Sequence, residues 1–85
     1  MPYIPPNERH RLFQVFSLSE KIETLGQLTY VIYVLCLEWL GRQGVNYANY
    51  ASVMGALECC TTELYRKEVA GYEDEKELQN GEIGL

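Results

Sequence analysis

The stretch YVIYVLCLEWL, residues 30–40, carries one charge in eleven residues. Apolar residues extend back to Leu28, and the run is stopped by Gln27 and Gly41. An α-helix of this composition is apolar on nearly every side, so other protein or lipid must cover it. The run reaches only about half of the roughly 20 residues that cross a bilayer. We therefore expect a helix over 27–43 that is covered by protein and ends at Gly44.

Two apolar stripes run along this expected helix, at about 100° of rotation per residue. We assign one stripe to the core of the subunit itself: Leu28, Ile32, Leu35 and Trp39. The second stripe lies on another face and consists of Tyr30, Tyr33, Leu37 and Leu40. An exposed patch of this kind marks an interaction surface, and tyrosine is enriched at interface cores. We expect a homo-oligomer with the second stripe at a two-fold interface. The alternative is a monomer in which the flanking helices and the tail wrap the central helix.

The flanking segments indicate two further helices. Residues 1–7 are expected to be an extended lead-in, because Pro5 and Pro6 disfavour helix in the residues that precede them. Asn7 is then expected to cap a helix over 8–24. A third helix covers 49–70, capped by Asn46 or Asn49, and Gly71 separates it from an acidic appendage over 72–85. No segment alternates as a strand does. The sequence predicts one all-α domain, 1–85, built as a small three-helix bundle with a short acidic C-terminal helix or tail.

The net charge of −5 is concentrated at the C-terminus. Residues 72–85 hold five acids against Lys76, a net of −4, and the remaining residues have a net of −1. A chain without a basic surface is not expected to bind nucleic acid. The opening MPYIPPNERHR lacks the apolar core of a signal peptide. We expect a cytoplasmic protein with no membrane partner.

Residues that could carry catalysis or hold a metal form no recognisable constellation. Cys36, Cys59 and Cys60 have no CxxC spacing, and we expect them to be small buried side chains in a reducing compartment. His10 is the single histidine, so neither a zinc site nor a di-iron site is expected. No nucleophile, phosphate-loop or calcium-loop motif is present. We predict no enzyme activity, no catalytic residue, no metal site and no cofactor.

Tyrosine is the unusual residue, with seven in the chain. These rings could simply fill the core and the interface. Alternatively, some could stack on a planar ligand whose charged groups meet arginine. For that alternative the candidate ligand-binding residues are Arg9, Arg11, Tyr47, Tyr50 and Arg66. The acidic appendage is open to two interpretations as well, as a solvated surface or as a segment that docks on a basic partner.

Four segments resemble a family of small uncharacterised proteins of bacteria, archaea and phages. They are MPYI, GQLTYVIYVL, VMGALECCTTELYRKEVA and YEDEKELQNGEI, which together span nearly the whole chain. The resemblance implies a compact helical protein and brings no catalytic residues with it. Gly71 departs from the proline expected there, so the separation of the appendage from the third helix is less sharp. The link to phages implies a binding function, either inhibiting a host protein or sequestering a signalling molecule used in defence.

These observations favour a non-enzymatic, self-associating helical binding protein that is phage-associated and antagonises host defence. Its ligand would be a small nucleotide-like molecule held between subunits. The alternative is a protein–protein inhibitor or adaptor that acts on a host protein through the acidic tail or the apolar face of the helix over 27–43.

Overall fold

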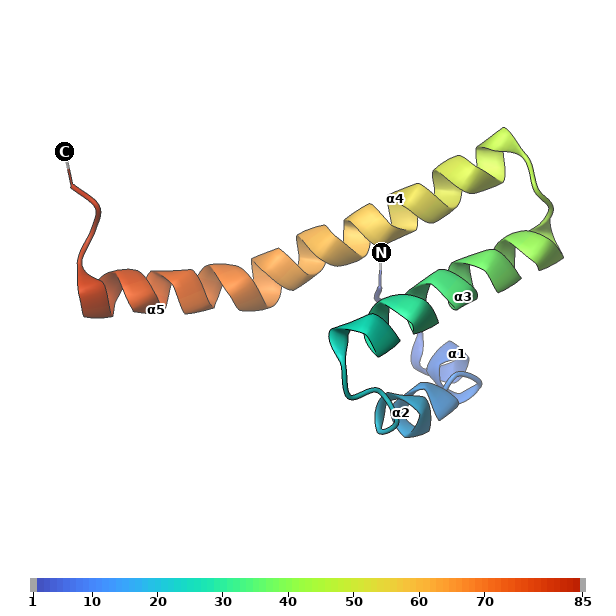
Figure 1. The fold of residues 1–85 in the computed structure, drawn as a ribbon, viewed down its shortest axis with the longest axis horizontal. Helices are drawn as coiled ribbons and strands as arrows, with labels where there is room; N and C mark the ends of the chain where they lie inside the picture. Colours follow the sequence, from blue (N-terminus) through green and yellow to red (C-terminus); the bar gives the residue numbers. More distant parts are fainter. Residues whose placement is uncertain (1, 85) are drawn as a thin grey trace. The chain divides into compact units, whose positions relative to one another are not determined.

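A computed structural model describes residues 2–84, and these residues contain helices and no strand. The helices follow one another along the chain (Figure 1). The fold class is therefore all-α, as the sequence predicts. Their order is α1 (Pro6–His10), α2 (Gln14–Ser19), α3 (Leu25–Gln43), α4 (Tyr47–Leu64), the π-helical turn η1 (Tyr65–Val69) and α5 (Ala70–Asn80).

The described residues divide into two compact units. One unit is Tyr3–Met54, and the other runs from Gly55 onward and includes Pro2. Each unit is treated by itself below. The first residue of the expected lead-in and the last residue of the expected acidic appendage lie outside the described residues.

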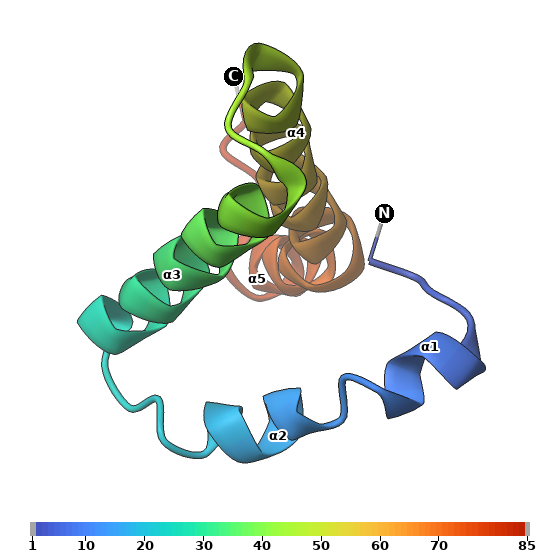
Figure 2. The ribbon, with the colours of Figure 1, turned by 90° about the vertical axis from the view of Figure 1, so that its right-hand side faces the viewer.

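The helix expected over 8–24 is two short helices, α1 and α2, separated by a turn (Figure 2). Pro6 occupies the start of α1, where a missing N–H costs nothing. Between the helices the backbone changes to i→i+3 bonds: the Leu12 N–H donates to the Arg9 carbonyl over 3.0 Å, and the Phe13 N–H donates to His10 over 3.4 Å. This tighter winding rotates the following side chains away from the face that a continuous α-helix would have.

A capping box begins α3. The Gln27 N–H donates to the Thr24 hydroxyl over 3.1 Å, and the Gln27 side-chain oxygen accepts from the Thr24 N–H over 3.0 Å. Two of the N–H groups that a helix start leaves unpaired are thereby satisfied. The helix ends at Gly44, whose φ of 113° is a conformation that residues with a Cβ rarely adopt. The expected helix over 27–43 thus corresponds to Leu25–Gln43.

Both asparagines considered as caps are used at the turn between α3 and α4. The Asn46 carboxamide oxygen accepts from the Asn49 N–H over 2.8 Å, which satisfies a donor in the first turn of α4. The Asn49 side chain points back and donates to the carbonyls of Gln43, over 3.2 Å, and of Gly44, over 2.8 Å. The two side chains therefore fix the end of one helix and the start of the next.

No helical break occurs at Gly71, where the sequence indicates one. The chain stays helical from Tyr47 to Asn80, and the irregularity lies in η1, just before Gly71. The Ala70 N–H bonds to the Tyr65 carbonyl, five residues back, as in a π-helix. The residues expected as an acidic appendage over 72–85 begin inside α5, which ends at Gly81 with a φ of 82°.

Side-chain burial is slight. Leu40, 6% exposed, is the one described residue that is buried. Within Tyr3–Met54 no two helices lie close enough along their lengths to form a helix–helix interface. The three-helix bundle is therefore not confirmed.

Candidate functional site

The second stripe of α3 is largely open to solvent. Tyr30 is 69% exposed, Tyr33 65% and Leu37 48%. Leu40, predicted to belong to the same stripe, is buried and does not contribute to an exposed surface. Leu40 lies in the last turn of α3, where its carbonyl accepts from the Gly44 N–H. The exposed surface is therefore Tyr30, Tyr33 and Leu37, which we call the α3 stripe.

The stripe that we assigned to the core of the subunit is exposed too. Its members are 36% to 56% exposed: Leu28, Ile32, Leu35 and Trp39. Two half-buried valines, Val31 and Val34, lie on a third face. α3 is thus apolar on nearly every side, and the described part of the chain leaves most of that surface uncovered.

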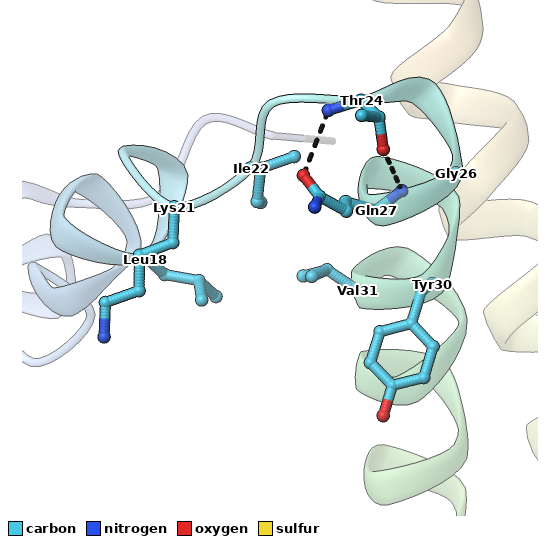
Figure 3. A pocket seen from close by; sticks show the side chains of 8 residues that line it. All are labelled: Leu18, Lys21, Ile22, Thr24, Gly26, Gln27, Tyr30 and Val31. Atoms are coloured by element: carbon cyan, nitrogen blue, oxygen red, sulfur yellow. Dashed lines mark hydrogen bonds between the residues drawn. The ribbon is translucent and has the colours of Figure 1, made fainter.

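An open hollow of about 480 Å³ lies beside the start of α3 (Figure 3). Figure 3 shows its two sides, one from the end of α2 and the residues after it, the other from the first turns of α3. The residues that line it are Leu18, Lys21, Ile22, Thr24, Gly26, Gln27, Tyr30 and Val31.

The chemistry of this hollow combines apolar walls with one cation. Leu18, Ile22 and Val31 supply the apolar surface, Lys21 supplies a positive charge, and Tyr30 supplies a ring with a hydroxyl. The capping box of Thr24 and Gln27 fixes the backbone at its edge. A planar ligand with an anionic group matches this combination, since rings stack on tyrosine and ammonium groups pair with anions.

Of the five predicted ligand-binding residues, four lie in the unit Tyr3–Met54 and Arg66 lies in the other unit. The Arg9 Nε–H donates to the Ile4 carbonyl over 2.8 Å, and Arg66 pairs with Glu63 over 2.7 Å. Arg11, Tyr47 and Tyr50 are exposed. No hydrogen bond or ion pair of the described chain joins any two of the five. The hollow is lined by none of them.

Sequence reasoning missed the residues of the hollow before Tyr30. One signal was available: Thr24-x-x-Gln27 fits the capping-box pattern and places the start of α3 at Leu25. That start would have made residues 20–24 a connecting turn and put Lys21 next to the first turn of α3.

The cysteines differ from the expected buried set. Cys36 is half-buried, but Cys59 and Cys60 are exposed on α4. No group of three or more metal-ligating side chains occurs in the part of the chain that the structure describes. Among residues 2–84, no helix has the length and apolar character needed to cross a membrane.

In the other unit, the acidic residues of α5 act on Tyr65. Its hydroxyl donates to the Glu73 carboxylate over 3.1 Å. This hydrogen bond, together with the charges of Glu73 and Asp74 and slight desolvation, raises the pKa of Tyr65 above its ordinary 10.0. Lys76 lies over the Tyr72 ring, 5.5 Å from its centroid. α5 is thus an exposed helix whose charges interact mainly with its own neighbours.

Comparison with known proteins identifies a family and no relative of known activity. No curated protein matches the chain significantly, and no solved structure does. One family model matches residues 1–83, nearly the whole chain, and the protein therefore belongs to that family, which is described as a domain of unknown function (DUF6899).

Proposed function

We propose that this protein is a non-enzymatic, self-associating helical binding protein in which the α3 stripe packs against a second copy. The observation that carries the proposal is the exposure of Tyr30, Tyr33 and Leu37 on a helix that is apolar nearly all round. Two aromatic rings and a leucine have the composition of an interface core. A second copy is the simplest partner, because it presents the same stripe about a two-fold axis.

The exposure of further apolar side chains on the same helix supports this proposal. Leu28, Ile32 and Leu35 of α3 are exposed as well as the α3 stripe. Obligate interfaces are more hydrophobic than transient ones. The bundle expected from the sequence would then form between copies, with helices of two chains sharing one core.

The proposed ligand is a small nucleotide-like molecule, held at the edge of this interface. Tyr30 supports the proposal, because it belongs both to the α3 stripe and to the hollow that contains Lys21. A base could stack on the Tyr30 ring while Lys21 meets a phosphate. The exposed Arg11, Tyr47 and Tyr50 are available to a ligand bound between copies. The proposed setting, drawn from the resemblance to phage proteins, is the cytoplasm of a host whose defence signal is sequestered.

A second candidate function is a protein–protein inhibitor or adaptor. It is favoured by α5, an exposed helix with Glu73, Asp74, Glu75 and Glu77, whose contacts within its own unit are with η1, the turn just before it in the same helical segment. Such a helix could dock on a basic host protein. Deleting residues 72–85 would remove that partner in a pull-down, whereas ligand sequestration would survive the deletion.

Native mass spectrometry tests the leading proposal. The protein, purified gently from cells, is measured as an intact assembly and again after denaturation. The expected result is an oligomer with an added mass of a few hundred daltons that is released on denaturation. An oligomer without added mass would retain the self-association and remove the ligand. A monomer at high micromolar concentration would overturn the proposal.

A further inference from the structure

The π-helical turn η1 lies inside an otherwise regular helical segment. Figure 1 shows no break in the ribbon between the end of α4 and α5. At the end of η1 the Ala70 N–H bonds to the Tyr65 carbonyl, where an α-helix would use the Val69 N–H. π-helical turns are rare in proteins and occur frequently at functional sites. An interaction that favours this form is therefore expected close to η1.

The backbone of this segment is not forced into the π form. η1 contains neither proline nor glycine, and the residues on either side of it, Leu64 and Ala70, have α-helical backbone angles. Gly71 follows directly, and glycine weakens an exposed helix because it has more conformational freedom in the unfolded chain. The same residues can therefore form α-helical hydrogen bonds as well.

One side-chain hydrogen bond depends on the π form. The Tyr65 hydroxyl donates to the Glu73 carboxylate over 3.1 Å. Residues eight apart diverge by about 80° around an α-helix, but the extra residue of η1 makes them equivalent to positions seven apart, which nearly coincide. An α-helix through η1 would therefore separate the two side chains and break this bond.

The other side-chain contacts near η1 do not depend on its form. Arg66 pairs with Glu63, three residues earlier, a spacing at which side chains meet in an α-helix too. Lys76 contacts side chains of its own helix. In the part of the chain that the structure describes, α5 packs on no helix other than the adjoining η1. A rotation of α5 about its axis would thus break the bond between Tyr65 and Glu73 and disrupt no helix packing.

We propose that η1 is a joint with two registers, a π form and an α form, and that the hydrogen bond between Tyr65 and Glu73 holds it in the π form. When this bond opens, the Tyr65 carbonyl exchanges the Ala70 N–H for the Val69 N–H, and η1 becomes α-helical. α5 then rotates by roughly 100° about its axis relative to the end of α4. One hydrogen bond thereby sets the direction in which α5 presents its charges.

The change of register rearranges the acidic residues of this segment. In the π form Glu58, Glu73 and Glu77 lie within about 40° of one another around the helix. In the α form the same three carboxylates spread over about 100°. A partner that contacts this row of carboxylates would bind one register more tightly than the other. The joint concerns residues 55–84 alone and depends neither on the α3 stripe nor on self-association.

NMR of the full chain, labelled with deuterium, carbon-13 and nitrogen-15, tests this inference. Scalar coupling across the hydrogen bond identifies the amide that bonds to the Tyr65 carbonyl, which is Ala70 in the π form and Val69 in the α form. Relaxation dispersion of the amides of residues 66–72 detects exchange with a minor form on the microsecond-to-millisecond timescale. We expect coupling to Ala70 in the native chain, together with exchange. Coupling to Val69 as the major form, or no exchange at these amides, would overturn the inference.

Two matched substitutions test the role of the hydrogen bond. Tyr65→Phe removes the hydroxyl that donates to Glu73, and Tyr72→Phe removes the hydroxyl of a tyrosine that is 60% exposed. We expect Tyr65→Phe to raise the ratio of the α form to the π form roughly fivefold, the scale of one exposed hydrogen bond. Tyr72→Phe should leave the ratio nearly unchanged. Equal effects of the two variants would contradict the inference.

A deletion covers the case in which Tyr65→Phe does not fold. Deleting Glu68 removes the extra residue of η1, so a regular α-helix places Tyr65 and Glu73 seven residues apart and keeps their hydrogen bond. We expect the deletion to abolish exchange at the amides around η1, while the pKa of Tyr65 stays above its ordinary 10.0. Exchange that persists in the deletion variant would show a motion other than a change of register and would overturn the inference. A monomer by sedimentation would overturn the proposed self-association and leave the joint unaffected.

Discussion

The Tyr65 hydroxyl and the Glu73 carboxylate are joined by a hydrogen bond of 3.1 Å across the π-helical turn. Their separation of eight residues fits no regular α-helical contact. The bond exists because one extra residue in η1 rotates α5 into line with the end of α4. Tyr65 and Glu73 therefore report on the register of α5 relative to the end of α4.

This hydrogen bond predicts the titration of Tyr65. Glu73→Gln should lower the pKa of Tyr65 toward its ordinary 10.0, because the acceptor loses its charge. NMR of chains with labelled tyrosine rings measures this pKa directly. Glu75→Gln is the matched control, since it removes a carboxylate from the same helix and leaves the bond to Tyr65 in place.

The raised pKa of Tyr65 also predicts how the stability of the fold changes with pH. Folding raises the pKa of Tyr65, so the folded chain holds the phenolic proton more tightly than the unfolded chain. The contribution to stability is complete below about pH 10 and is lost as the pH rises through the raised value. Between pH 8 and pH 11, the free energy of unfolding in urea should fall less for Tyr65→Phe than for the native chain. An equal loss would mean that the bond is absent in solution.

Removing the capping box should destabilise the start of α3. Thr24→Ala leaves the Gln27 N–H without its acceptor, and such changes cost about 1 kcal/mol. Urea unfolding followed by circular dichroism measures this loss. Thr29→Ala is a suitable control, because Thr29 is exposed on the same helix and its hydroxyl bonds only to carbonyls one turn back. Similar losses for both variants would argue against a specific role of the cap.

A charge in the α3 stripe should weaken the proposed self-association. Leu37→Lys would place an ammonium group in the proposed interface, and burying an unpaired charge there is strongly unfavourable. We expect the dissociation constant of the oligomer to rise by a factor of ten or more in analytical ultracentrifugation. Glu38→Lys, one residue along and outside the stripe, should have a much smaller effect. If Leu37→Lys left the dissociation constant unchanged, the interface would lie elsewhere.

Two glycines should respond to alanine in opposite directions. At Gly71 an added Cβ meets nothing within 4 Å, and its φ is compatible with a helix. Gly71→Ala should therefore stabilise the helical segment by about 0.5–1 kcal/mol. Gly44 has a φ of 113°, so Gly44→Ala should destabilise the turn after α3. Thermal unfolding at one fixed protein concentration compares the two. A loss of stability for Gly71→Ala would show that the helix does not pass through this position.

The sequence was informative where local chemistry determines structure. The helical class, the span of the central helix, its end at Gly44 and the cap at Asn46 all follow from residues within a few positions of one another. The expectation of an uncharacterised family agrees with the match over residues 1–83 to a domain of unknown function.

The sequence was less informative where structure depends on winding or on a partner. The i→i+3 turn at Leu12 and the π-helical turn at Tyr65 change the hydrogen-bond spacing without any proline or glycine inside them. Burial was the other difficulty. Helical spacing shows which side chains share a face, but whether that face is covered depends on other elements or other copies. Trp39 and Leu40 are neighbours in the apolar run, yet only Leu40 is withdrawn from water.

The isolation of Leu40 as the one buried described side chain has a consequence for the amount of protein in a cell. A single copy gains little hydrophobic free energy to offset the entropy lost in ordering its helices. Under the proposed self-association, folding and assembly form one equilibrium, and unpaired chains are substrates for proteases. Newly made chains would be cleared while they are scarce and would persist once they are abundant enough to pair. The amount of protein would therefore rise sharply above a threshold of gene dosage and would not be proportional to it.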